Sequence, residues 1–85
     1  MNPEEIREMY MRGFTVPRAA ELLNVTVVQV ERAVKTLTQF QLNLRRENQR
    51  QLIRQGIREG LTQTQVAEQL GVTQAFVSLS LSNKR

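Results

Sequence analysis

The stretch Gln63–Leu81, QTQVAEQLGVTQAFVSLSL, predicts two short helices separated by a tight turn. Thr62 precedes it and is followed three residues later by Gln65, which is the spacing of a capping box at a helix start. Gly71 tolerates the positive φ of a turn, and Thr73 is placed to cap the second helix. The side chains expected to face a core are Ala67, Leu70, Val77 and Leu81.

A second copy of this pattern lies in the N-terminal half of the chain. Moving the 85-residue sequence by 47 residues aligns Ile6–Val30 with Ile53–Val77, and ten of these 25 pairs are identical. The identities include Gly13 and Gly60, whereas Asn24 replaces the turn glycine. Such self-similarity indicates one supersecondary unit used twice.

Each unit is predicted to contain three helices. The first helix is expected at about Pro3–Arg12 in one unit and about Glu47–Glu59 in the other, and a glycine ends each. No alternating β-rich segment and no hairpin dipeptide occurs, so no wing is expected. We therefore predict an all-α fold of two tandem three-helix units joined by a helical connection, with segments 1–38, 39–46 and 47–85.

The quoted stretch resembles the helix-turn-helix of phage repressor and Cro proteins. Ala67 matches the small residue that lets the two helices approach, Gly71 the turn glycine, and Val77 the buried aliphatic residue of the recognition helix. The resemblance covers residues 51–85, with a diverged copy at 3–35. It implies two helix-turn-helix units and DNA binding. Repressors of that type continue into further helices, so the second unit is expected to complete its core with the first unit and the connection.

The helix predicted at 73–82 carries the candidate base-reading residues. Gln74 has the donor and the acceptor needed to bind adenine N6 and N7 together. Ala75 and Leu79 are suited to thymine methyl groups, and the Ser78 hydroxyl either donates or accepts. The resemblance implies similar roles at these four positions, on a helix that enters the major groove.

Phosphate contacts are expected around the starts of the two helices and after the second helix. Backbone amides at helix N-termini bind phosphate, and polar or basic side chains assist them. The residues expected in this role are Gln63, Thr64, Thr73, Ser82, Asn83, Lys84 and Arg85.

The first unit departs from this pattern. Val27 and Val28 occupy its first two base-reading positions, and a valine cannot form a hydrogen bond with a base edge. Arg32 and Lys35 remain able to reach phosphates. The first unit is therefore interpreted either as a second DNA contact or as a structural or dimerising element.

The connection is a candidate dimer element. No Gly or Pro occurs between Arg18 and Gln55, so the third helix of the first unit could run on through it. Units of about 40 residues rarely fold alone without a metal, disulfide or partner, so we expect a homodimer. Alternatively, the same apolar stripe packs within the chain, with a bend near Gln41–Asn43. The apolar positions with coiled-coil spacing are Val30, Ala33, Leu37, Phe40 and Leu44.

Basic residues are concentrated in the C-terminal half. Residues 1–42 carry five basic and five acidic side chains, whereas residues 43–85 carry seven basic and three acidic ones, which accounts for the whole net charge of +4. A basic half suggests a polyanion partner, either nucleic acid or an acidic membrane surface. It is also compatible with a solvated basic face.

The absence of cysteine and histidine excludes several classes of site. Disulfides, thiolate nucleophiles, Cys/His zinc sites and the usual general base are all removed. No catalytic set occurs at a recognisable spacing. We expect no enzyme activity, metal, cofactor or small-molecule ligand.

The sequence favours a sequence-specific double-stranded DNA-binding transcriptional regulator, in the form of a dimeric repressor of phage or plasmid type. The alternatives are a DNA-binding accessory factor for partition, transposition or packaging, and a protein-interaction module. No apolar run approaches the roughly 18 residues of a membrane span, and the start MNPEEIRE is too acidic for a signal peptide. A cytoplasmic protein of bacterial, phage or plasmid origin is therefore expected, with no membrane partner.

Overall fold

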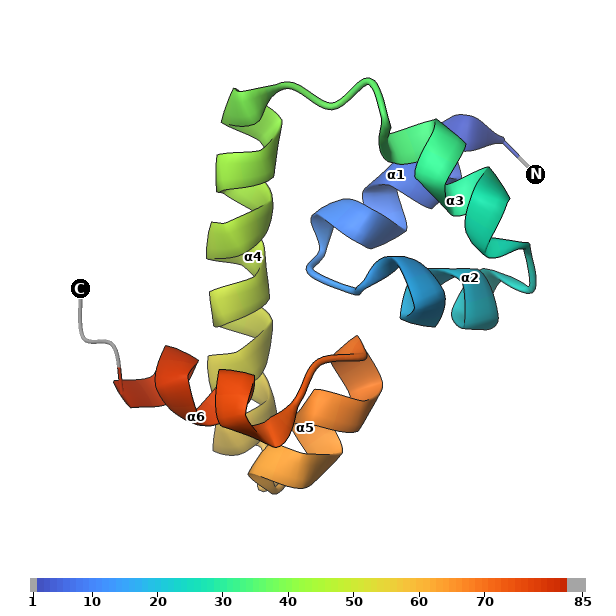
Figure 1. Ribbon diagram of the computed structural model, residues 1–85. Coiled ribbons are helices and arrows are strands. Elements are labelled where there is room, and N and C mark those ends of the chain that lie inside the picture. The colour runs from blue at the N-terminus through green and yellow to red at the C-terminus, as the bar shows by residue number, and fades with distance from the viewer. Residues whose placement is uncertain (1, 83–85) are drawn as a thin grey trace.

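The computed structural model describes residues 2–82. Their secondary structure consists of helices joined by turns, and they contain no strand. The long helix α4 runs along one side of the molecule, with α1, α2 and α3 beside it and with α5 and α6 near its C-terminal end (Figure 1). None of these helices has the length and apolar character needed to cross a membrane. The helices are α1 (Pro3–Met11), α2 (Val16–Leu23), α3 (Val27–Val34), α4 (Gln39–Arg58), α5 (Gln63–Leu70) and α6 (Gln74–Ser82).

Threonine side chains cap the N-termini of α2, α3, α5 and α6. The caps of α5 and α6, at Thr62 and Thr73, were predicted from the sequence. Thr62 and Gln65 form a complete capping box: each side chain accepts a hydrogen bond from the other residue's backbone N–H, at 3.1 and 2.9 Å. The Thr73 hydroxyl accepts from the backbone N–H of Phe76 at 3.1 Å. The turn before α6 uses Gly71 at φ +82°, so the two short helices and the tight turn predicted for the quoted stretch are confirmed.

Two apolar clusters form the interior. The first gathers buried side chains from α1, α2 and α3, and the second gathers buried side chains from α4, α5 and α6. Phe14, in the turn between α1 and α2, packs against both clusters and joins them. The largest fully buried side chains are Val30, Ile53, Val66 and Val77.

The connection differs from the expectation. α4 begins at Gln39 rather than near Glu47, so residues 39–46 belong to the same helix as the segment that follows. The break lies at residues 35–38, and there is no bend at Gln41–Asn43. Thr38 has extended backbone angles and forms a capping box with Gln41. This cap starts α4 as a new helix, separate from α3, which ends at Val34.

The predicted continuous coiled-coil seam is therefore not formed. Val30 and Ala33 are buried inside the first cluster, so they are not available to a partner. Leu37 is half-buried in the break between α3 and α4. Phe40 and Leu44 lie on α4, with 71% and 44% of their surfaces exposed. The stripe is divided because the two capped helices run in different directions (Figure 1).

Arg45 of α4 holds the end of α1 and the turn after it. Its guanidinium donates to the backbone carbonyls of Tyr10 at 2.9 Å and Phe14 at 2.8 Å, and it lies 3.9 Å from the centroid of the Tyr10 ring. Burial lowers the pKa of the Arg45 guanidinium from its ordinary value. This arginine therefore contributes to the structure, although it is one of the seven basic residues counted in the C-terminal half.

Two neighbouring amides of α4 complete this junction. The Asn48 side chain donates to the Met11 carbonyl at 2.8 Å, and the buried Gln49 side chain donates to the Gly13 carbonyl at 2.7 Å. Met11 is the last residue of α1 and Gly13 follows the helix, so neither carbonyl has a partner within it. The two halves are therefore joined by directed hydrogen bonds as well as by the shared Phe14.

Candidate nucleic-acid interface

The surface of α6 presents most of the candidate base-reading residues to solvent. Val77 is fully buried and fixes the helix on the second cluster. Gln74, Ala75 and Leu79 are exposed, and Leu79 has 70% of its surface accessible. Ser78 is half-buried. One polar side chain, Gln74, is thus displayed together with the apolar Ala75 and Leu79 on one short helix.

The candidate phosphate-contacting residues form a less uniform set. Thr64 is exposed and Gln63 half-buried at the start of α5. The hydroxyl of Thr73 already caps α6, and the hydroxyl of Ser82 donates to the Ser78 carbonyl at 3.0 Å. The last three candidates lie outside the described residues: Asn83, Lys84 and Arg85.

Phe76 is a surface feature that the sequence analysis did not identify. Its side chain is 40% exposed and lies with Leu79 along a groove of about 480 Å³ between α4 and α6. The internal repeat could have predicted its exposure, because Phe76 aligns with the polar Gln29 of the first unit, which indicates a surface position. The other residues that line this groove are Arg45, Arg46, Gln49, Arg50 and Ser80.

The equivalent surface of the first unit is apolar. Val27 and Val28 at the start of α3 are 42% and 54% exposed, and Leu22 of α2 is 45% exposed. Arg32 and Lys35 are exposed toward the other end of α3. The structure therefore brings no hydrogen-bonding side chain to the two positions that correspond to Gln74 and Ala75.

The two units also differ in what covers the start of their middle helix. The backbone N–H of Thr15 donates to the Leu70 carbonyl, and Arg18 Nε donates to the Gln69 carbonyl, both at 2.9 Å. Residues at the start of α2 thus cap the end of α5. This approach is close enough that a Cβ on Gly71 would collide with the Thr15 hydroxyl.

Among residues 2–82, the start of α5 forms no hydrogen bond with a distant part of the chain. There Thr62 and Gln65 satisfy one another through the capping box, and both are exposed. Within residues 2–82, the start of α2 is therefore engaged by another helix, whereas the start of α5 is exposed.

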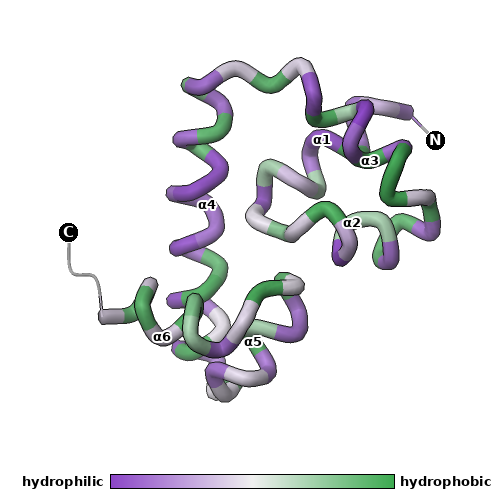
Figure 2. The backbone as a smooth tube through the Cα atoms, in the orientation of Figure 1, coloured by the Kyte–Doolittle hydropathy of each residue, from purple (hydrophilic) through white to green (hydrophobic). Residues whose placement is uncertain are grey.

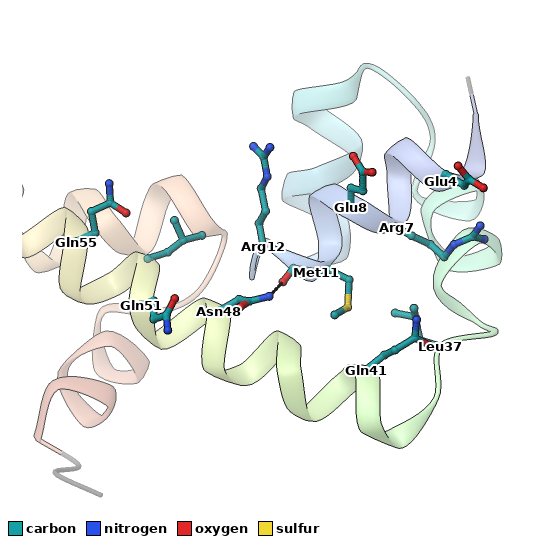
Figure 3. A pocket seen from close by; sticks show the side chains of 11 residues that line it. Glu4, Arg7, Glu8, Met11, Arg12, Leu37, Gln41, Asn48, Gln51 and Gln55 are labelled. Atoms are coloured by element: carbon teal, nitrogen blue, oxygen red, sulfur yellow. Dashed lines mark hydrogen bonds between the residues drawn. The ribbon is translucent and has the colours of Figure 1, made fainter.

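A larger concave surface lies elsewhere, between α1 and α4 (Figure 3). It measures about 750 Å³, and the Asn48–Met11 hydrogen bond crosses its middle. Acidic and basic side chains of α1 alternate along it, including Glu8 and Arg12. Within residues 2–82, carboxylates do not gather in groups of three or more that would hold a metal ion.

Comparison with known protein families, curated proteins and solved structures finds no significant match to this chain.

Proposed function

We propose that this chain is a sequence-specific double-stranded DNA-binding transcriptional regulator, a dimeric repressor of phage or plasmid type built from two tandem helix-turn-helix units. The second unit reads the major groove with the helix 73–82, and the first unit supports it. The internal repeat and the two apolar clusters support the tandem arrangement. The observation that carries the proposal is the exposed face of α6 beside an uncovered start of α5.

The assignment of the reading unit rests on an asymmetry between the two units. A helix-turn-helix protein binds DNA with the N-terminal residues of its recognition helix at the base edges, while the N-termini of its helices contact phosphates. In the second unit, Gln74 is exposed and the start of α5 is open. In the first unit, two valines replace the reading residues, and the end of α5 covers the start of α2.

The size of the chain supports a homodimer. The molecule measures 33 × 27 × 19 Å along its principal axes. Successive major grooves on one face of DNA are separated by about 34–36 Å, so α3 and α6 of one chain are too close together to occupy both. One chain therefore serves one half-site, and a second chain supplies the other.

The test begins with selection of bound sequences from a random duplex pool. Gln74→Ala is expected to lose about 1–3 kcal/mol of binding free energy and to relax the preference at one base pair per half-site. The matched change Val28→Ala, at an exposed position of α3, should leave the base profile unchanged. If the valine variant alters the profile and the glutamine variant does not, reader and support have been assigned the wrong way round.

The exposed apolar surface of Leu22, Val27 and Val28 supports a second candidate, a protein-interaction module. Complete absence of salt-dependent DNA binding would favour it. Binding to long arrays of repeated sites away from promoters would instead favour an accessory factor for partition, transposition or packaging.

A further inference from the structure

We propose that four arginines of α4 form a phosphate-binding ridge that contacts the backbone of duplex DNA beside the major groove entered by α6. The inference rests on the proposed function, because α6 sets the position of the duplex. The ridge is defined as Arg46, Arg50, Arg54 and Arg58.

The net charge of α4 accounts for the net charge of the whole protein. α4 contains five arginines and one glutamate, a net charge of +4. Outside α4, seven basic and seven acidic side chains cancel. The hydrophilic character of the middle of α4 contrasts with the apolar stretches of α6 (Figure 2). The net field that attracts a polyanion therefore originates at α4.

The spacing of the arginines produces a continuous row. Residues four apart on a helix form one of its natural surface ridges and rise by about 6 Å per step. The four arginines thus extend over about 18 Å along the helix. Successive phosphates of one DNA strand advance by about 3.4 Å along the duplex axis, so the length of the ridge equals that of a run of about five phosphates.

The side chains of the ridge are available for this contact. Arg46, Arg54 and Arg58 are exposed, whereas Arg50 is half-buried and lies 3.6 Å from Glu47, the one ion pair of the ridge within residues 2–82. A planar guanidinium binds phosphate through two parallel hydrogen bonds, which a lysine cannot do. Arg45 differs because its guanidinium is directed to backbone carbonyls within the chain.

The groove between α4 and α6 places the ridge next to the candidate reading surface. Arg46 and Arg50 line one wall of this groove, and Phe76 and Leu79 line the other. Leu79 belongs to the proposed base-reading face. A duplex held by α6 therefore has its phosphate backbone within reach of Arg46 and Arg50, at the N-terminal end of the ridge. The other two arginines continue the ridge toward the C-terminus of α4.

The test compares two single variants in the full-length protein. Arg46→Gln removes one ridge charge, and Arg12→Gln removes one charge at the C-cap of α1. Both side chains are exposed and without an ion pair in the described part of the chain. Because both variants lower the net charge equally, they separate a local contact from a general field.

Affinity is measured against salt concentration for the selected duplex, a random duplex and a single-stranded oligonucleotide. The ridge variant should lower the log–log salt slope by about 0.9 per protomer on both duplexes, with the base preference retained. The control variant should keep the wild-type slope, and thermal melting should show both variants folded.

Several results would overturn the ridge. An unchanged slope in the ridge variant, or an equal loss in both variants, would refute it while the proposed function stands. A loss confined to the single-stranded oligonucleotide would assign the ridge to a different ligand. A wild-type protein without any salt-dependent duplex binding would overturn the proposed function and the ridge together.

Discussion

Gly13 and Gly60 occupy equivalent positions in the 47-residue repeat, and both have a positive φ, +119° and +96°. Their surroundings differ. A Cβ on Gly13 would lie 2.7 Å from the Cα of Gln49, whereas a Cβ on Gly60 would meet nothing within 4 Å. The first glycine is required by backbone conformation and by contact with α4, and the second by conformation alone.

Gly60→Ala should therefore destabilise the protein by about 1–2 kcal/mol through backbone strain. Gly13→Ala should cost about 3–5 kcal/mol, because a steric clash with the backbone of α4 adds to that strain. Chemical denaturation of the two variants measures the difference. Equal losses would show that the close approach of Gly13 to Gln49 is absent in solution.

At the scale of the element, α4 combines two functions on different faces. Its inward face carries Ile53 into the second cluster and uses Arg45 and Gln49 to hold the end of α1. Its outward face carries the arginine ridge. The same residue type therefore has a structural role at position 45 and a proposed binding role at position 46.

Arg45→Lys should destabilise the protein by about 2 kcal/mol. Lysine cannot donate to both the Tyr10 and Phe14 carbonyls in the same geometry or place a planar group over the Tyr10 ring. Arg46→Lys is the control at the adjacent exposed position and should leave the thermal midpoint unchanged. If both variants melt at the wild-type temperature, the junction between α1 and α4 does not depend on the guanidinium.

At the scale of the whole molecule, two exposed apolar surfaces are candidates for the dimer interface. Phe40 and Leu44 form one on the outer side of α4, and Val27 and Val28 belong to the other at the start of α3. Large exposed apolar side chains that gather on a surface mark interaction sites. The broken seam leaves Phe40 and Leu44 as the part of the predicted stripe that a partner can still reach.

Phe40→Glu should convert the proposed dimer to monomers, because it would place an unpaired charge in an apolar contact. The melting temperature of the monomer should remain close to that of the wild type at low concentration, since Phe40 is 71% exposed. Sedimentation measures the oligomeric state, and Val28→Glu is the comparison. Dimers that persist in the first variant and dissociate in the second would place the interface on α3.

The sequence by itself determined the all-helical character of residues 2–82, the starts of α5 and α6 and the turn between them. These features depend on contacts within about four residues: Thr62 with Gln65, Thr73 with the N–H of Phe76, and a positive φ at Gly71. It also predicted which side of α6 would be buried, because the spacing of Val77 and Leu81 reflects the helical period.

Only the tertiary structure decided where these elements meet. The spacing from Val30 to Leu44 matched a continuous seam, yet Thr38 starts a new helix and the stripe is divided between the interior and the surface. Helical periodicity indicates that a face is apolar but does not specify what covers it. Likewise, Arg45 acts on carbonyls 31 and 35 residues away, and Thr15 caps Leu70, because these contacts depend on how the two clusters dock around Phe14.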